Sequence, residues 1–225
     1  SEEARQIQWD RLYYANQQGN LNGSDAMYFM TARYNNNINL ALASTLNTKL
    51  GKNTSLNVGL QLAANMSHNY QKIDDLLGAN HVSNINTYAL GNYPMGDPHV
   101  YYDMRNQTAQ LKEGDKYAFD YNLNTRKAQL WSSLKFGKGN YQGFLAGRIG
   151  GVTMQRDGKM ENGIAVAQGN GVTSYGKSGT GKFLDGGAKL GITSHTLSKY
   201  GITWNVGVGF EYRAPTPKTA FVSAD

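Results

Sequence analysis

The stretch YGKSGTGKF, residues 175–183, has the clearest chemical spacing in the sequence. Gly176, Gly181 and Lys182 match G-x-x-x-x-G-K, a loop that binds nucleotide phosphates through its backbone N–H groups. The next residue should be Ser or Thr to hold magnesium, but it is Phe183. The motif also needs a following helix whose N-terminus supports the phosphate. Because FLDGGAKLGIT alternates in polarity and is rich in glycine, the sequence predicts a loop without a nucleotide.

Possible metal ligands do not have the spacing of a metal site. Four histidines stand far apart, as expected for surface or loop residues: His68, His81, His99 and His195. Acidic residues gather between residues 70 and 118, among them Asp74, Asp75, Asp97 and Asp103. They lack the D-x-D-x-D-G pattern of a calcium loop, which leaves open a calcium site assembled from several loops.

The sequence contains no pattern that indicates catalysis. Cysteine is absent, which excludes disulfides and thiolate metal sites. No Ser, His and Asp constellation and no G-x-S-x-G elbow occurs, and nothing selects a pair of carboxylates for glycoside chemistry. We therefore expect a protein that is not an enzyme and has no cofactor.

Charge and hydropathy exclude further classes. The formal net charge is +6, but Lys and Arg are spread along the 225 residues without a dense block, so nucleic acid is not an expected partner. No run approaches the ~18 apolar residues of a transmembrane helix, and no signal peptide opens the chain. The first residue is Ser, which suggests a processed, tagged or excised chain.

A two-residue rhythm indicates the secondary structure that carries these residues. In NINLALASTLNTKLGKNTSLNVGLQLAANMS, residues 37–67, apolar and polar residues alternate on both sides of a turn at 51–54. This pattern predicts a β-hairpin with one apolar and one polar face. Strands in soluble domains usually have about 5 to 6 residues, whereas each arm here alternates over about 12 to 14. A long soluble hairpin and two strands of an outer-membrane barrel both fit.

The rhythm returns in two further pairs of strands. Residues 121–136 change phase, with Tyr121 and Leu123 before the change on the apolar side, and a turn at 137–140 leads to a less regular strand. A third hairpin joins residues 184–193 to 202–213. The prediction is an all-β fold: a segment of an antiparallel up-and-down transmembrane β-barrel with about six long strands. Short periplasmic turns would alternate with long extracellular loops, as in bacterial outer-membrane barrels.

The predicted organisation is one partial barrel domain over residues 1–225. Residues 1–35 lead into the first strand; hairpins follow at 36–69, 119–156 and 182–213; long loops lie at 70–118 and 157–181; and 214–225 begin the next loop. Short helices are predicted in QIQWDRLYYANQQ and in KIDDLLGAN, residues 72–80, the latter closed by Gly78.

In a barrel, the alternation assigns side chains to lipid or to the interior. Predicted lipid-facing residues are Ile38, Leu40, Leu42, Leu56, Val58, Leu60, Ile202, Trp204, Val206, Val208 and Phe210. Predicted lumen-facing residues are Asn39, Asn47, Asn57, Gln61, Asn65, Asn205, Glu211 and Arg213. Aromatics expected in interfacial belts at strand ends are Tyr70, Phe136, Tyr141, Phe210 and Tyr212.

Several segments resemble the TonB-dependent outer-membrane receptors, and more narrowly the large plug-containing receptors with a carboxypeptidase-regulatory-like region. They are DLLGA at 75–79, KEGDKYAFDYNLNTRKAQLW at 112–131, RDGKMENG at 156–163, YGKS at 175–178 and RAPTPKTAFVS at 213–223. The second and last are the more specific. The resemblance extends from about residue 37 to the end of the chain and implies a plugged barrel of about 22 strands.

The resemblance implies TonB-dependent import of a siderophore, glycan, peptide or similar ligand across the outer membrane. Implied partners are membrane lipid, the remainder of the barrel, the plug, TonB through that plug, and a surface lipoprotein. The chain has no plug-like region and about six strands, so we expect an internal portion of the barrel. Two alternatives stay open: a small self-contained outer-membrane barrel of structural or adhesive role, with extra strands from AMYFMTARY and the loops, and a soluble β-rich carbohydrate-binding module.

Overall fold

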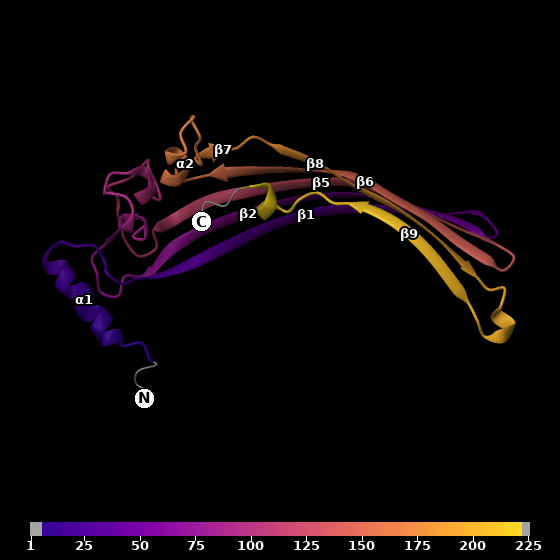
Figure 1. Ribbon diagram of the computed structural model, residues 1–225, viewed down its shortest axis with the longest axis horizontal. Coiled ribbons are helices and arrows are strands. Elements are labelled where there is room, and N and C mark those ends of the chain that lie inside the picture. Colours follow the sequence, from indigo (N-terminus) through magenta and orange to yellow (C-terminus); the bar gives the residue numbers. More distant parts are fainter. Residues whose placement is uncertain (1–5, 222–225) are drawn as a thin grey trace.

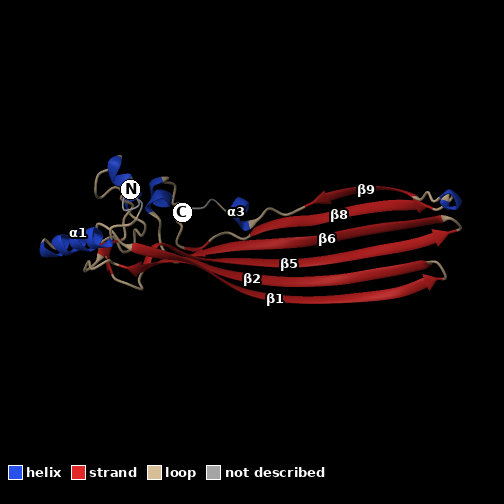
Figure 2. Ribbon diagram, turned by 90° about the horizontal axis from the view of Figure 1, so that it is seen from below, coloured by secondary structure: helices blue, strands red, loops and turns tan. Residues whose placement is uncertain are grey.

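The protein is dominated by one curved antiparallel sheet (Figures 1 and 2). The computed structural model describes residues 6–221. Six long strands lie side by side in chain order: β1 (Met30–Gly51), β2 (Thr54–Asp75), β5 (Lys116–Lys138), β6 (Tyr141–Gly158), β8 (Gly181–Ser194) and β9 (Trp204–Tyr212). Each is antiparallel to the next. The prediction of an all-β, up-and-down antiparallel fold is confirmed.

Short connections lie at one end of the sheet and long ones at the other (Figure 2). Two-residue turns, at 52–53 and 139–140, join β1 to β2 and β5 to β6. Gly139 has φ +59°, a conformation that a residue without a side chain adopts at little cost. Residues 195–203, with the 3₁₀ helix η4 (Ser198–Tyr200), join β8 to β9. We call this the turn end, and the opposite end, which carries segments 76–115 and 159–180, the loop end.

The remaining short elements lie mostly at the loop end (Figure 1). Helices are α1 (Trp9–Leu21), α2 (Gly163–Ala167), η2 (Ala89–Gly91), η3 (Pro98–Val100) and α3 (Pro217–Ala220). Short strands are β3 (Val82–Ser83), which pairs with β4 (Gln110–Leu111), and β7 (Gly176–Lys177), which pairs with β6. The helix predicted near the N-terminus is therefore confirmed as α1. Part of the loop predicted at 214–225, residues 222–225, lies outside the described residues, as do residues 1–5.

The predicted helix at 72–80 is wrong. β2 continues through Asp75, and the chain then turns through Leu77 and Gly78, whose φ angles are +49° and +81°. Hairpin 1 thus covers residues 30–75 rather than 36–69, and hairpin 2 covers 116–158 rather than 119–156. Backbone pairing extends the strands beyond the alternating stretch because ladder hydrogen bonds do not require an apolar face.

The predicted change of phase in residues 121–136 is also wrong. The register of β5 with both neighbours runs without a shift from Tyr121 to Phe136. A one-residue slip would need a β-bulge, and none interrupts this stretch. Tyr121 and Leu123 therefore lie on the opposite side of the sheet from Ala128, Leu130 and Leu134. They are nearer the loop end than the stretch in which that side is apolar.

The third hairpin is shorter than predicted at its last strand. β9 begins at Trp204, so Ile202 lies in the connection and not in a strand. The segment AMYFMTARY forms no separate strand, because its residues from Met30 onward belong to β1. The extra strands that a small closed barrel would need are thus absent from residues 6–221, where the sheet stays open.

The buried core lies beside the sheet, at the loop end. Ile73, Leu76, Val82 and Ala26 form one cluster, with Phe29, Ala79, Leu111 and Tyr117 packed against it. Ile73 is 1% exposed, at the loop-end limit of β2. No helix among the described residues is long and apolar enough to cross a membrane. The sheet therefore extends away from its only core cluster of described residues.

Candidate functional site: the two faces of the sheet

Strand register assembles one continuous apolar face. Residues directly opposite in an antiparallel pair point to the same side of the sheet. One row crosses all six strands and consists almost entirely of large aliphatic residues: Thr48, Leu56, Leu134, Leu145, Leu190 and Val208. The next row contains Leu46, Val58, Ser132, Gly147, Ala188 and Phe210. We call this side the apolar face and the other the polar face.

The structure brings together on the apolar face every residue predicted to face lipid except Ile202. In register these are Ile38, Leu40, Leu42, Leu56, Val58, Leu60, Trp204, Val206, Val208 and Phe210. Leu40 is 73% exposed and Phe210 is 74% exposed, while Leu56 and Val58 are half-buried by neighbouring strands. The face is thus a broad exposed hydrophobic surface, a kind that soluble monomers rarely present.

The apolar band ends at a definite height on each strand. Toward the loop end the same face carries Ala64, Arg126, Thr153 and Lys182 in one row, and then His68, Asn122 and Asp157 in a higher one. From Ile38 to Leu50, β1 extends about 40 Å at ~3.4 Å per residue. A barrel tilt of about 40° reduces this to about 31 Å, close to the ~30 Å thickness of a bilayer's hydrocarbon core.

Aromatic rings lie near both limits of the band. At the loop end Tyr34 stacks on Tyr70, with ring centroids 5.0 Å apart. At the turn end Phe136, Tyr141 and Trp204 lie on the apolar face. These positions agree with the predicted belts.

Two predicted belt residues lie elsewhere. Phe210 and Tyr212 are at mid-height, in the rows of Leu46 and Leu60, because β9 ends far short of its neighbours.

The polar face collects the predicted lumen-facing side chains. Those within strands are Asn39, Asn47, Asn57, Gln61, Asn65, Asn205 and Glu211, and Arg213 follows β9 directly. Cross-strand amides bond to one another: Asn65 donates to Asn39 and Asn35 donates to Asn69, both at 2.5 Å. Amide pairs of this kind satisfy each other without closing the face to water.

An ionic network crosses four strands on the polar face. Arg148 of β6 pairs with Asp185 of β8 and, at 2.6 Å, with Glu211 of β9. Lys127 of β5 lies 3.8 Å from Asp185, and Arg213 lies 2.8 Å from Glu211. Asp185 is buried by these neighbours. Sequence reasoning missed Arg148, Asp185 and Lys127, because only the register across β5, β6 and β8 reveals that they meet.

Glycines opposite aromatics let rings lie flat on the sheet. A Cβ at Gly59 would meet the Trp131 ring at 2.4 Å, and one at Gly191 would meet the Phe144 ring at 2.5 Å. Each pair is directly opposite in register, on the polar face. These rings occupy the space of the missing side chains, which explains why an otherwise hydrophilic face carries large aromatics.

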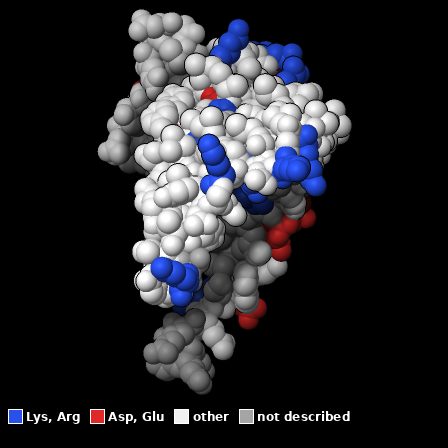
Figure 3. Space-filling view, turned by 90° about the vertical axis from the view of Figure 1, so that its right-hand side faces the viewer, with Lys and Arg blue, Asp and Glu red and all other residues white. Residues whose placement is uncertain are grey.

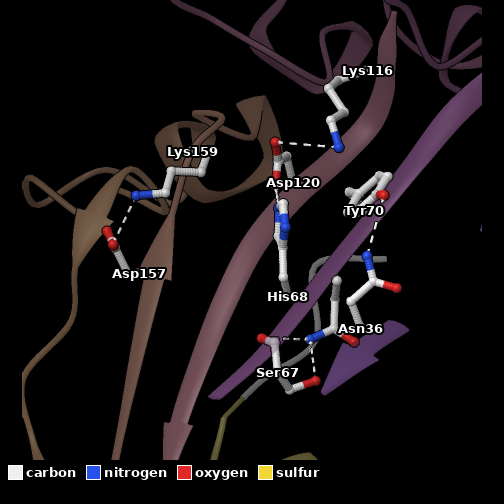
Figure 4. A network of polar contacts seen from close by, with 9 residues as sticks. Asn36, Ser67, His68, Tyr70, Lys116, Asp120, Asp157 and Lys159 are labelled. Atoms are coloured by element: carbon white, nitrogen blue, oxygen red, sulfur yellow. Dashed lines mark hydrogen bonds and ion pairs between the residues drawn. The ribbon is translucent and has the colours of Figure 1, made fainter. Parts of the chain in front are cut away.

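Above the apolar band, polar contacts replace aliphatic ones on the same face (Figure 4). His68 lies 2.6 Å from Asp120, and Lys116 lies 4.0 Å from the other oxygen of that carboxylate. The Lys116 ammonium is 2.7 Å from the centroid of the Tyr70 ring. This part of the apolar face is thus suited to contact with water.

The loop end is held together by a buried amide. The Asn16 side chain of α1 donates to the carbonyls of Tyr28, Leu76 and Leu77 at 2.7, 3.0 and 3.2 Å. Its oxygen accepts from the backbone N–H groups of Met27 and Tyr28. One side chain therefore joins α1 to both ends of hairpin 1.

A second loop contact involves a titratable pair. The backbone N–H and the ring of His99 bond to the Asp97 carboxylate at 2.9 and 2.7 Å and lower the pKa of Asp97. Tyr93 stacks on the His99 ring at 4.0 Å. Nearby, burial raises the pKa of the Tyr102 hydroxyl. These contacts order the long loop between β2 and β5.

The residues considered for phosphate or metal binding do not form such a site among residues 6–221. Gly176 lies in β7, and Gly181, Lys182 and Phe183 begin β8, so the stretch that resembles a phosphate-binding loop has no following helix. Within residues 6–221 no group of three or more His, Cys, Asp or Glu could hold a metal ion. Asp74, Asp75, Asp97 and Asp103 therefore form no calcium cluster in the described part of the chain.

The turn end is basic. Exposed lysines in or beside the turns are Lys49, Lys52, Lys135, Lys138 and Lys199, and the strand ends around them contain no Asp or Glu. Figure 3 looks onto this end and shows Lys and Arg side chains spread over the visible surface. The acidic residues between positions 6 and 221 instead lie toward the loop end and in the mid-strand ionic network.

Comparison of the chain with protein-family models, with curated proteins and with solved structures finds no match.

Proposed function

We propose that the chain is a segment of an outer-membrane β-barrel, with the apolar face against lipid and the polar face toward a wet interior. One observation carries this: register across six strands assembles one broad exposed face dominated by aliphatic residues, which on β1 would be about 31 Å tall at a barrel tilt of about 40°. Water is a poor environment for such a surface, since each Å² of apolar area exposed costs about 25 cal/mol. Lipid tails remove that cost.

The polar face supports a water-filled interior. Its amide pairs and the ionic network around Arg148 retain exposed donors and acceptors, which water satisfies and hydrocarbon does not. If the two faces were reversed in a bilayer, each unsatisfied group would cost several kcal/mol. This difference in cost is why we assign the polar face to the interior and the apolar face to lipid.

The open edges support membership of a larger barrel. Among residues 6–221 no strand pairs with the outer edge of β1 or of β9. Unpaired backbone groups are not tolerated within a bilayer, because no water is present to bond them. Both edges therefore require further strands, which the remainder of the barrel would supply.

The proposed activity is TonB-dependent import of a siderophore, glycan, peptide or similar ligand. It rests on the resemblance of segments such as RAPTPKTAFVS, together with the proposed barrel. The short turns would face the periplasm and segments 76–115 and 159–180 the cell exterior, where a surface lipoprotein could contact them. The plug, through which TonB acts, would belong to the remainder of the receptor.

The membrane placement is tested by fractionating cells that produce the full gene product. We expect it in the outer-membrane fraction, resistant to extraction with urea and soluble only with detergent. A gel shift between unheated and heated samples should accompany this, because folded barrels resist dodecyl sulfate. A monodisperse product without detergent would overturn the proposal and favour a soluble β-rich module.

The transport activity is tested separately. Cells with and without the gene are offered a panel of siderophores, glycans and peptides, and depletion of each from the medium is measured. We expect at least one compound to be depleted only when the gene is present, and depletion to stop when a protonophore collapses the inner-membrane gradient. Gene-dependent depletion that survives the protonophore would contradict TonB-dependent import while leaving the membrane placement intact.

A further inference from the structure

A depression of about 560 Å³ lies on the apolar face, at its boundary with the polar rows. Its lining includes one row across four strands, Leu62, Ala128, Gly151 and Leu184, together with residues next to this row on β5, β6 and β8. The two central residues are small and the two outer ones are large, which produces a trough two strands wide. A Cβ added at Gly151 would meet nothing closer than 3.9 Å, so the trough is open at its centre.

Two cationic side chains, Arg126 and Lys182, line the side of this trough nearer the loop end. Arg126 and Lys182 lie in the next row, on either side of Thr153. Their backbones are two strand spacings apart, about 10 Å. Both side chains are exposed, and within residues 6–221 neither forms an ion pair. Long cationic side chains at this separation can reach one phosphate between them.

Among the residues that the structure describes, no carboxylate on the apolar face pairs with these cations. Asp120 is bonded to His68 and Lys116, and Asp157 to Lys159, in rows nearer the loop end. Asp185 belongs to the polar face, where Arg148 and Lys127 hold it. The charge above the trough is therefore positive and unopposed, directly beside an aliphatic floor.

We propose that this trough binds an anionic lipid with a phosphate-containing headgroup, the phosphate between Arg126 and Lys182. Its glycerol region would lie over Ala128 and Gly151, and its acyl chains would continue down the band past Leu130 and Ile149. Two cations directly beside an aliphatic floor match a ligand that has an anionic head and an apolar tail. An anionic lipid has this chemistry, and a protein surface matches it less well. This inference rests on the proposed membrane placement and adds a specific lipid class and position.

The test uses the full gene product purified in detergent and titrated with phosphatidylglycerol or phosphatidylcholine of identical chains, with bound lipid counted by native mass spectrometry. The double variant Arg126→Gln/Lys182→Gln should bind phosphatidylglycerol about 30-fold more weakly. This corresponds to about 2 kcal/mol at 1.4 kcal/mol per tenfold, from two cations beside an anionic lipid. Binding of phosphatidylcholine should be unchanged.

The matched control is Lys135→Gln/Lys189→Gln, which removes the same charge from exposed positions on the polar face. It should change phosphatidylglycerol binding less than about twofold. Gly151→Leu keeps both cations and fills the trough, so it should also weaken phosphatidylglycerol binding. Equal losses in the two double variants would overturn the proposal by indicating a general charge effect.

Two further results would distinguish a lipid site from a simple anion site and from a wrong membrane placement. Displacement of phosphatidylglycerol by millimolar inorganic phosphate, together with no effect of Gly151→Leu, would indicate a simple anion site and overturn the lipid assignment. A wild-type product that is soluble without detergent and retains neither lipid would contradict the membrane placement itself. A detergent-dependent product with unchanged lipid binding in Arg126→Gln/Lys182→Gln would overturn only the lipid site.

Discussion

Leu42 lies in β1 and Leu76 directly follows β2, yet the first leucine is 64% exposed and the second is 4% exposed. Leu76 belongs to the loop end, where the chain folds back on itself and forms a core. Leu42 belongs to the band, where nothing among the described residues covers it. The protein therefore buries Leu76 itself, whereas the proposed membrane would supply the apolar environment for Leu42.

Polar groups differ between the two regions in the same way. At the loop end the Asn16 amide is 2% exposed and bonds five backbone groups. On the sheet, polar side chains are confined to one face, and strand pairing satisfies the backbone. A region in water can direct polar groups outward everywhere, whereas a lipid-covered face cannot.

The largest expected effect compares truncation in the two regions. Ile73→Ala should destabilise the loop end by about 4 kcal/mol, because it leaves a cavity beside Leu76 and Val82. Leu42→Ala should cost less than about 1 kcal/mol, since exposed side chains contribute little packing. Urea unfolding of the full gene product in phospholipid vesicles measures both. Equal costs would mean that a partner buries the band as tightly as a protein core.

The second prediction distinguishes lipid from water around the band. Leu42→Arg should destabilise the protein in vesicles by about 2 kcal/mol, because a charged residue on the lipid face costs about 2 to 4 kcal/mol at the bilayer centre and less toward the interface. The control Ala43→Arg introduces the same charge one residue away, on the polar face, and should stay within about 0.5 kcal/mol. If the two variants unfold at the same urea concentration, the band faces water.

The third prediction concerns the buried amide of the loop end. Asn16→Ala should reduce local stability by about 2 kcal/mol, because the carbonyls of Leu76 and Leu77 and the N–H of Met27 lose their partner. Hydrogen exchange of the Met27 and Tyr28 amides reports the opening. Asn20→Ala removes more exposed bonds to Gly78 and Asn80 and should have a smaller effect. A larger effect of Asn20→Ala would contradict the role assigned to Asn16.

The smallest effect is a pH dependence of the long loop. The folded pKa of Asp97 is below its ordinary value of 3.8 because His99 bonds to its carboxylate. This contact therefore contributes stability above the unfolded pKa and loses it as the pH falls through the folded pKa. Titration of the Asp97 carboxyl carbon by NMR should give a midpoint below 3.8. Replacing His99 with Ala removes the ring bond but keeps the backbone N–H bond, so the midpoint should rise only part of the way toward 3.8, and an unchanged midpoint would show that the backbone bond alone lowers the pKa.

Much of the sheet could be predicted from the sequence because side-chain alternation is a local property. Ile38 to Leu50 and Leu56 to Met66 report their own period, and the turn at 51–54 fixes which strands pair. The failures have the same origin. Tyr121 and Leu123 lie beyond the apolar band, where the polarity of a residue no longer indicates which face of the sheet it is on. The helix predicted around Leu77 does not form, because β2 continues to Asp75 and the chain then turns.

The residues along each strand were enough to establish that six amphipathic strands exist and, for most of them, which residues share a side. The joining of these sides into one face became visible only in three dimensions, since the register between β2 and β5 depends on residues far apart in the chain. The register of the successive strand pairs places Arg148 beside Asp185 and puts Arg126 and Lys182 over one trough. It also places Phe210 midway between the loop end and the turn end of the sheet. Alternation is set by neighbouring residues, whereas the height of a residue on the sheet is set by every strand pairing before it.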